Sequence, residues 1–327
     1  MFELIRPDTQ IDFVGRKNLW MGISIAAVII TGILFFTKGL NYGIDFTGGA
    51  EIQIKVPATW DIGKVRSTLE TGGLNNPKVQ QIGAEADHQF LVKEQGDESQ
   101  LNQISAQVRG ILDKNLQAGE YEIQKVDVVG PAAGGSLRMS GFLSMLYALI
   151  CILIYVTIRF DMRYSPGAVL ALAHDTIITV GIFIVTQKQF DLQILAAVLA
   201  LIGYSNNDTI IVYDRVRETA HAHPELTIDK VVNRAINETL GRTILTSLCT
   251  FLTVFCLWLL GGKVIENFAF TLMVGIVVGT YSSIFIASSI VINMSHYLEK
   301  REATDKMQGG SKKKRQITVR PEPKFEA

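Results

Sequence analysis

Four consecutive polar residues interrupt a segment that is otherwise apolar enough to cross a bilayer. Residues 192–213 contain Ser205, Asn206, Asn207 and Asp208 in a row. An ionised carboxylate inside a membrane span costs about 2.5 to 3.5 kcal/mol on insertion scales, and such residues usually face a bundle interior or a water-filled path. Asp208 is therefore a candidate for binding a proton or another cation, or for an ion pair within the membrane.

A basic residue stands at the start of the next apolar segment. Arg242 directly precedes residues 243–260, and Asp208 lies about 9 Å beyond the midpoint of its own segment at 1.5 Å per residue. Because consecutive spans run in opposite directions, both charges fall in the same half of the membrane. An opposite charge keeps a carboxylate ionised, and its displacement favours protonation. The sequence therefore predicts an ion-coupling site in which Asp208, with Asn207 beside it, faces Arg242.

A second polar point lies near the middle of residues 166–186, where His174 and Asp175 are adjacent. Neighbouring residues project about 100° apart on a helix, so both cannot face one neighbouring helix squarely. Either one of them is a structural hydrogen-bonding residue, or the pair belongs to the path of an ion. The sequence leaves these two interpretations open.

The rest of the chain has to hold these groups inside a membrane. The chain is 48% hydrophobic over 327 residues, but its apolar residues gather in blocks instead of being distributed as in a soluble core. About 20 apolar residues span the hydrocarbon of a bilayer. The segments that approach this length are 19–37, 140–158, 166–186, 192–213, 243–260 and 268–293.

Lysine and arginine predict the orientation of these spans, because cytoplasmic loops carry an excess of both. The two tails and the connections after the second and fourth spans are basic, whereas the short connections on the opposite side hold only Lys188 and Lys263. Both termini should therefore be cytoplasmic. The expected parts are a cytoplasmic tail 1–18, a first span 19–37, an outer domain 38–136, a five-helix bundle 137–295 and a basic cytoplasmic tail 296–327.

Residues 38–136 change from unbroken apolar runs to short alternating ones bounded by Gly, Pro and Asn. Alternation predicts strands, and apolar residues at helical spacing predict helices. The order βαββαβ indicates a small ferredoxin-like α+β domain, which we expect to contact another protein instead of doing chemistry. The expected strands are 51–56, 79–84, 89–93 and 121–129, and the expected helices are 61–71 and 101–116.

Two further patterns concern packing. Gly275 and Gly279 form a G-x-x-x-G in the sixth span, which permits close helix packing, expected within this chain or against a partner subunit. Residues 226–240 place apolar side chains at helical spacing and predict an amphipathic helix on the cytoplasmic surface. The basic run 312–315 of the tail is compatible with contact with anionic lipid or the ribosome, but its simplest interpretation is positive-inside topology with a disordered tail. Membrane lipid is an expected partner, and nucleic acid is not.

Two motifs resemble those of a known family. Residues 41–49 resemble the G-x-D-F-x-G-G signature of the SecD/SecF family, and residues 203–218 resemble the fourth-span signature of its SecF branch. The arrangement of six spans with one large loop after the first is also similar. The motif residues in this sequence are Asp45, Phe46, Gly48, Gly49, Gly203, Tyr204, Ser205, Thr209, Asp214 and Arg215.

The resemblance implies a polytopic subunit of the SecDF accessory complex, in the RND superfamily, in the bacterial inner membrane. Family members pair with SecD, work beside the SecYEG channel and use the proton-motive force to assist preprotein translocation. Asp208 and Arg242 match the positions that the family uses functionally, and His174 with Asp175 becomes a possible relay. Asn206 departs from the pattern, because family members usually carry an aliphatic residue there; residues 129–137 follow the pattern only in part.

The energy source is expected to be an ion gradient. The sequence has no G-x-x-x-x-G-K-[ST] phosphate loop, so we expect neither ATP hydrolysis nor another enzymatic activity by this chain, and no cofactor. The expected coupling ion is H⁺, with Na⁺ as the alternative. Two other functions remain open: a half-transporter for a lipid or small molecule, and an uncoupled scaffold of the export machinery.

Overall fold

A computed structural model describes residues 10–74, 77–82, 87–94, 98–117, 119–160 and 163–316. Within these ranges, six helices are long and apolar enough to cross a membrane, which confirms the polytopic fold predicted from the sequence. The sixth combines two α-helices joined by a π-helical turn, η2 (Ser283–Ala287). The others are α1 (Lys17–Thr37), α5 (Pro131–Arg159), α6 (Ser165–Thr186), α7 (Leu192–Ala222) and α8 (Ile228–Leu260), and the sixth joins α9 (Lys263–Ser282) to α10 (Ser288–Gln316).

Three helices continue beyond the apolar segments that predicted them. Helix α7 extends to Ala222, and α8 begins at Ile228, so the amphipathic helix expected at 226–240 and the fifth span form one continuous helix. Helix α10 continues to Gln316, into the segment assigned to the tail, of which residues 317–327 lie outside the described ranges. Hydropathy marks only the part of a helix that lipid can cover.

The sheet of the small domain contains β1 (Gly49–Lys55), β2 (Lys78–Ile82), β3 (Gln89–Glu94) and β4 (Glu122–Val129). Its strand order is β2-β3-β1-β4 with antiparallel neighbours, as expected for a ferredoxin-like domain. Residues 83 and 84, predicted as the end of a strand, lie outside the described residues.

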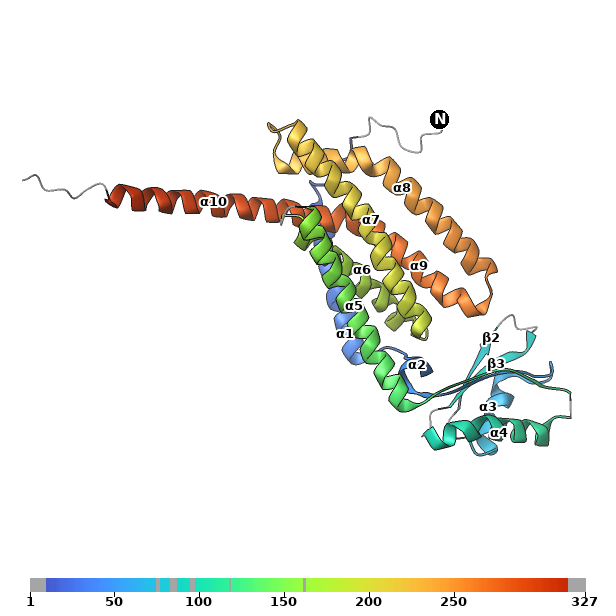
Figure 1. The fold of residues 1–327 in the computed structure, drawn as a ribbon. Coiled ribbons are helices and arrows are strands. Elements are labelled where there is room, and N and C mark those ends of the chain that lie inside the picture. The colour runs from blue at the N-terminus through green and yellow to red at the C-terminus, as the bar shows by residue number, and fades with distance from the viewer. Residues whose placement is uncertain are drawn as a thin grey trace, which may run out of the picture.

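Two helices cover one face of this sheet, as Figure 1 shows: α3 (Ile62–Thr71) and α4 (Glu98–Asn115). Asp61 caps α3 by accepting a hydrogen bond from the Lys64 N–H over 2.7 Å. The domain core lies between helices and sheet, where Ile52, Val65 and Val108 are 1% exposed or less. Burial of this face gives the domain a core separate from that of the bundle.

The small domain lies at one end of the helical bundle, the domain end, and α10 projects sideways from the bundle near the opposite, distal end (Figure 1). Helix α7 begins near the domain end and packs against α5, α6, α8 and α9. A short helix, α2 (Ile44–Thr47), connects the domain to the bundle. Its Phe46 is buried, with its ring centroid 5.9 Å from that of Phe190, just before α7.

Candidate functional site

Asp208 is 2% exposed and lies where three helices meet. Ser247 of α8 donates a hydrogen bond from Oγ to Asp208 Oδ2 over 3.1 Å. Thr280 of α9 in turn contacts Ser247, with 2.8 Å between the two hydroxyl oxygens. The acid of α7 is therefore held by a chain of neutral hydroxyl groups that also joins α8 to α9.

Arg242 does not form the ion pair that the sequence predicted. Among the residues that the structure describes, none brings a basic nitrogen within 4.0 Å of the Asp208 carboxylate. Arg242 is exposed on α8, although its charge still attracts Asp208 at longer range. Ser247 is five positions after Arg242, which corresponds to about 140° around the helix. Turning Ser247 toward Asp208 therefore turns Arg242 away from it.

The two asparagines before Asp208 lie on different faces of α7. Asn207 is exposed, four residues after the exposed Gly203, so it does not join the buried site. Asn206 is buried instead, and its Oδ1 has no hydrogen-bond partner among the described residues. On α8, Thr246 is exposed one turn from Arg242. Polar side chains of both helices therefore face outward from this chain.

Asp175 and His174 form a second buried polar group. Ser205 of α7 donates to Asp175 Oδ2 over 2.6 Å, and His174 Nδ1 lies 3.0 Å from Asp175 Oδ1. Asp175 is 1% exposed and His174 is 7% exposed. The ring of His174 lies 6.3 Å from that of Tyr281 on α9. The two neighbours thus contact different helices, as expected from their spacing, and Asp175 is the one that contacts α7.

Helix α9 lies against both polar groups. Its Gly279 packs against Ser205, which binds Asp175, and the adjacent Thr280 contacts Ser247, which binds Asp208. A Cβ atom at Gly279 would lie 2.8 Å from Ser205 Oγ, and one at Gly275 would lie 2.4 Å from the Leu201 side chain. The G-x-x-x-G motif therefore packs against α7 of the same chain. Small residues permit this close approach of the helix backbones.

The glycine motif joins the small domain to the start of α7. Asp45 Oδ2 accepts a hydrogen bond of 3.0 Å from the Leu192 N–H, at the helix end where negative charge is favourable. Gly48 has a φ of +74°, and a Cβ there would lie 2.6 Å from Pro131 Cα. Gly49 has a φ of +140°, and its Cβ would lie 2.7 Å from the Glu94 carbonyl oxygen. Both positions exclude a side chain by backbone conformation and by space.

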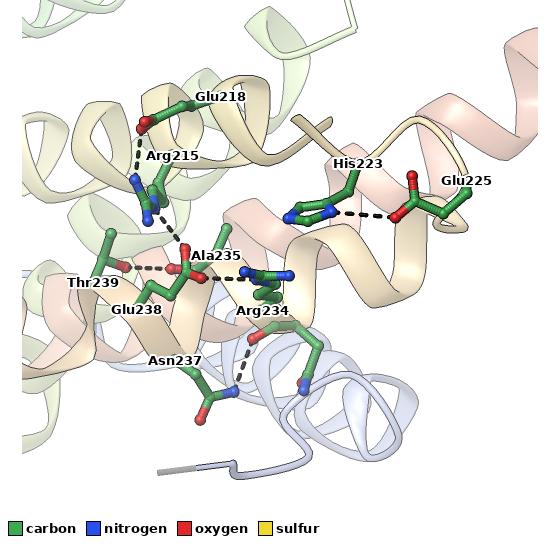
Figure 2. Close-up of polar contacts among 10 residues, drawn as sticks. Arg215, Glu218, His223, Glu225, Arg234, Ala235, Asn237, Glu238 and Thr239 are labelled. Atoms are coloured by element: carbon green, nitrogen blue, oxygen red, sulfur yellow. Dashed lines mark hydrogen bonds and ion pairs between the residues drawn. The ribbon is translucent and has the colours of Figure 1, made fainter. Parts of the chain in front are cut away.

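The end of the fourth-span motif forms ion pairs at the distal end. Arg215 binds Glu238 of α8 over 2.6 Å and Glu218 over 2.7 Å (Figure 2). Asp214 pairs with Arg159 of α5 over 3.2 Å. All three pairs are partly exposed; those with Glu238 and Arg159 fasten the distal part of α7 to α8 and α5, whereas Glu218 lies on α7 itself.

The remaining motif residues pack nearer the middle of α7. The Tyr204 hydroxyl lies 3.2 Å from Thr250 Oγ1 on α8, and buried Thr209 donates to the Ser205 carbonyl oxygen over 3.5 Å. The motif thus distributes its residues over several faces of one helix, and only some of them reach the Asp208 site.

Sequence reasoning did not identify Ser247 and Thr280 as parts of the Asp208 site, or Asp191 as the cap at the start of α7. Asp191 precedes α7 and caps it, accepting a hydrogen bond of 3.0 Å from the Ile194 N–H. An aspartate directly before an apolar helix is a pattern that could have predicted this cap. Serine and threonine occur in many membrane helices, so their type alone does not indicate the two hydroxyl contacts.

Two family models match this chain. The C-terminal model of the protein export membrane protein SecD/SecF matches residues 110–297, and the model of the SecD/SecF GG motif matches residues 33–56. The second match covers the motif that contains Asp45, Gly48 and Gly49. The first covers the five helices that build the polar groups around α7.

Curated proteins and solved structures agree with these matches. The protein translocase subunit SecF of Calditerrivibrio nitroreducens is 45% identical over 88% of this chain and 95% of its own length. The corresponding subunit of Magnetococcus marinus is 42% identical over 88% and 92%. The crystal structure of SecDF from Thermus thermophilus, described as a translocon-associated membrane protein, has a TM-score of 0.79 and 33% identity. It covers 89% of this chain, which spans 39% of that longer chain. The chain therefore belongs to the SecF family of protein translocase subunits.

Proposed function

We propose that this chain acts with a SecD subunit to assist preprotein translocation through SecYEG, driven by the proton-motive force, with Asp208 as the proton-binding group. The observation that carries this proposal is a carboxylate that is 2% exposed, inside a membrane bundle, and hydrogen-bonded by the neutral hydroxyl of Ser247. A buried acid without a close counter-charge is poised to bind a proton, because burial disfavours its charged form. The proposed role requires no enzymatic step and no cofactor. Na⁺ is the alternative coupling ion.

Proton binding would change the contacts that join three helices. The carboxylate accepts from Ser247, and Ser247 contacts Thr280. Neutralising Asp208 weakens its attraction for the hydroxyl proton and for the more distant Arg242, so the contacts of α7 with α8 and α9 shift. One charge moving across 100 mV supplies about 2.3 kcal/mol toward such a rearrangement.

A movement of α7 would reach the small domain through the glycine motif. The Asp45 carboxylate accepts a hydrogen bond from the first N–H of α7, and the chain continues from Asp45 through Gly48 and Gly49 into β1. The Gly43 N–H also donates to the Phe190 carbonyl oxygen over 2.7 Å. This short, tightly packed connection supports a mechanism in which the bundle repositions the domain that handles the preprotein.

The outward-facing polar residues of α7 and α8 support a partner subunit in the membrane. Asn207, Arg242 and Thr246 are exposed on helices that pass through the bundle. Lipid tails offer such groups no hydrogen bonds, so we infer that helices of SecD cover this face. Arg242 would then act at the junction of the two subunits, with anionic lipid near the basic tail.

The proposed orientation places the distal end and both termini in the cytoplasm of a bacterium and the small domain outside its inner membrane. It follows from the distribution of lysine and arginine along the chain. In this orientation the small domain faces preproteins that emerge from SecYEG, and Asp208 lies in the cytoplasmic half of the bundle.

The test is depletion of the chain in its host, followed by measurement of preprotein accumulation. Complementation compares the wild type with Asp208→Asn, Asp208→Glu and, as a matched control, Glu225→Gln in the exposed connection between α7 and α8. We expect Asp208→Asn to fail at normal protein level, Asp208→Glu to retain part of the export activity, and the control to restore it.

Proton flux into vesicles containing the SecDF complex is measured for the same variants. Full export and flux in Asp208→Asn would remove the basis of the coupling role. Normal export after depletion of the chain would instead favour a transporter of lipids or small molecules.

A further inference from the structure

Three buried hydroxyl residues follow one face of α8 at intervals of one helical turn. Thr239, Thr243 and Ser247 are spaced four residues apart and are 8%, 1% and 6% exposed. Ser247 is the residue that binds Asp208. Thr243 is therefore the next hydroxyl on that face, about 6 Å from Ser247 toward the distal end.

Thr243 differs from the other threonines of its helix. The whole of Ile228–Leu260 is described, and it contains five threonines, of which four donate their hydroxyl proton to the carbonyl oxygen four residues earlier. Of these five threonines, only Thr243 has a buried hydroxyl without a hydrogen-bond partner among the described residues. The four others are Thr239, Thr246, Thr250 and Thr253, with distances of 2.9, 3.0, 2.9 and 2.9 Å.

A buried hydroxyl without a partner costs about 1 to 3 kcal/mol, so this arrangement is unfavourable in the state described. A threonine in a helix can donate its hydroxyl proton to a backbone carbonyl oxygen of the preceding turn, and the other four threonines of α8 do so. If the Thr243 hydroxyl gains a hydrogen-bond partner in another conformation of the bundle, the unpaired hydroxyl in this one has an explanation.

The contacts between α7 and α8 locate this hydroxyl relative to the charged groups. Ser247 meets Asp208, and Glu238 meets Arg215 nearer the distal end. Because Thr243 lies between Ser247 and Glu238 on α8, its hydroxyl stands between the buried acid and the ion pairs of Figure 2. The exposed Arg242 is its neighbour in sequence.

We propose that Thr243 is a positioning residue for proton transfer, whose hydroxyl binds the water that connects Asp208 to the cytoplasm when the bundle opens at its distal end. This inference rests on the proposed function of Asp208. The protonated carboxyl releases its proton to that water, the Thr243 oxygen accepts a proton from the water, and the threonine proton passes to the next water. Only O–H bonds break and form, and one proton moves in net.

The experiment measures proton flux in vesicles containing the SecDF complex with Thr243→Val, Thr243→Ser and the control Thr253→Val. Valine has nearly the shape of threonine but no hydroxyl, and Thr253 is an exposed threonine of the same helix. We expect Thr243→Val to lower flux by about a hundredfold, the lower end of the roughly 10²- to 10⁴-fold range that positioned proton-transfer groups contribute. Thr243→Ser should keep most of the flux, and Thr253→Val should resemble the wild type.

Thermal unfolding separates this effect from misfolding. Removing an unpaired buried hydroxyl should leave the melting temperature of Thr243→Val unchanged or higher. Equal loss of flux in the valine and serine variants would overturn the inference, because it would indicate packing instead of a hydroxyl role. Wild-type flux in Thr243→Val, with none in Asp208→Asn, would also overturn it while leaving the proposed function intact. Flux retained by Asp208→Asn would contradict the proposed function itself.

Discussion

The Asp45 carboxylate accepts a hydrogen bond of 3.0 Å from the Leu192 N–H, so an acid of the glycine motif holds the helix that carries Asp208. The two residues are 147 positions apart in the chain. Helix α7 therefore receives two caps at its first turn, one from its own Asp191 and one from the segment that leads into β1. This contact makes the start of α7 a junction between bundle and domain.

Removal of the Asp45 carboxylate should loosen this junction. We expect Asp45→Ala to lower the free energy of unfolding of the bundle by about 0.5 to 2 kcal/mol, the usual cost of a lost helix cap. Hydrogen exchange should become faster at the Leu192 amide. Asp61→Ala is the control, because Asp61 caps α3 inside the small domain and should leave exchange at α7 unchanged. Unaltered exchange at Leu192 in Asp45→Ala would contradict the capping role.

A side chain at Gly48 should destabilise the connection between the small domain and the bundle more than a side chain at Gly39 does. Both residues have positive φ, of +74° and +69°, so alanine is strained at either site, and the ψ of 161° at Gly48 adds to the strain there because that backbone region is essentially open to glycine alone. At Gly48 the new Cβ would also lie 2.6 Å from Pro131 Cα, whereas at Gly39 it meets nothing within 4 Å. Thermal unfolding should therefore show a larger loss for Gly48→Ala. Equal losses would indicate that the close approach to α5 is unimportant.

Replacing Gly279 with alanine should disturb the hydrogen bond between Ser205 and Asp175 and lower the stability of the bundle. Its Cβ would lie 2.8 Å from Ser205 Oγ and 3.0 Å from Ser205 Cβ, and overpacking of this kind costs about 1 to 3 kcal/mol. Gly203→Ala on α7 is the control, because its Cβ meets nothing within 4 Å and alanine favours a helix by about 1 kcal/mol. We expect a lower melting temperature for Gly279→Ala and an equal or higher one for Gly203→Ala. The opposite order would show that α9 does not pack closely on α7.

The charge of Asp191 should make stability depend on pH. Burial raises the pKa of the Asp191 carboxyl above its ordinary value of 3.8, and the nearby Asp45 carboxylate adds to this effect. The folded chain then keeps this proton to higher pH than the unfolded chain does, so stability falls as the pH rises from 3.8 through the folded pKa.

Asparagine at position 191 keeps a capping oxygen and has no charge. The stability advantage of Asp191→Asn over the wild type should therefore grow as the pH rises from 3.8 and then level off. Unfolding midpoints measured across this range in one detergent provide the test. Parallel curves for the two proteins would show that burial does not shift this titration.

Local patterns in the sequence were sufficient to predict most elements of the fold, but not the short helix α2, the turn η2 or the extension of α10 beyond its span. Runs of apolar residues predicted the six spans, and period-two alternation predicted the strands of the small domain, because both depend on residues that are neighbours in the chain. The same reasoning identified Asp208 and Asp175, since a carboxylate within an apolar run is costly wherever the helix packs.

The sequence by itself determined which segments cross the membrane, the order of the small domain and which acids lie within the bundle. Only the tertiary structure decided that Ser247 instead of Arg242 binds Asp208, that Asn207 faces outward and that Asp45 caps α7. Each of these contacts depends on how a helix is rotated about its axis and on which distant segment packs against it. Those two quantities are set by close packing between helices, as at Gly279, and not by the residues next to each side chain in the chain.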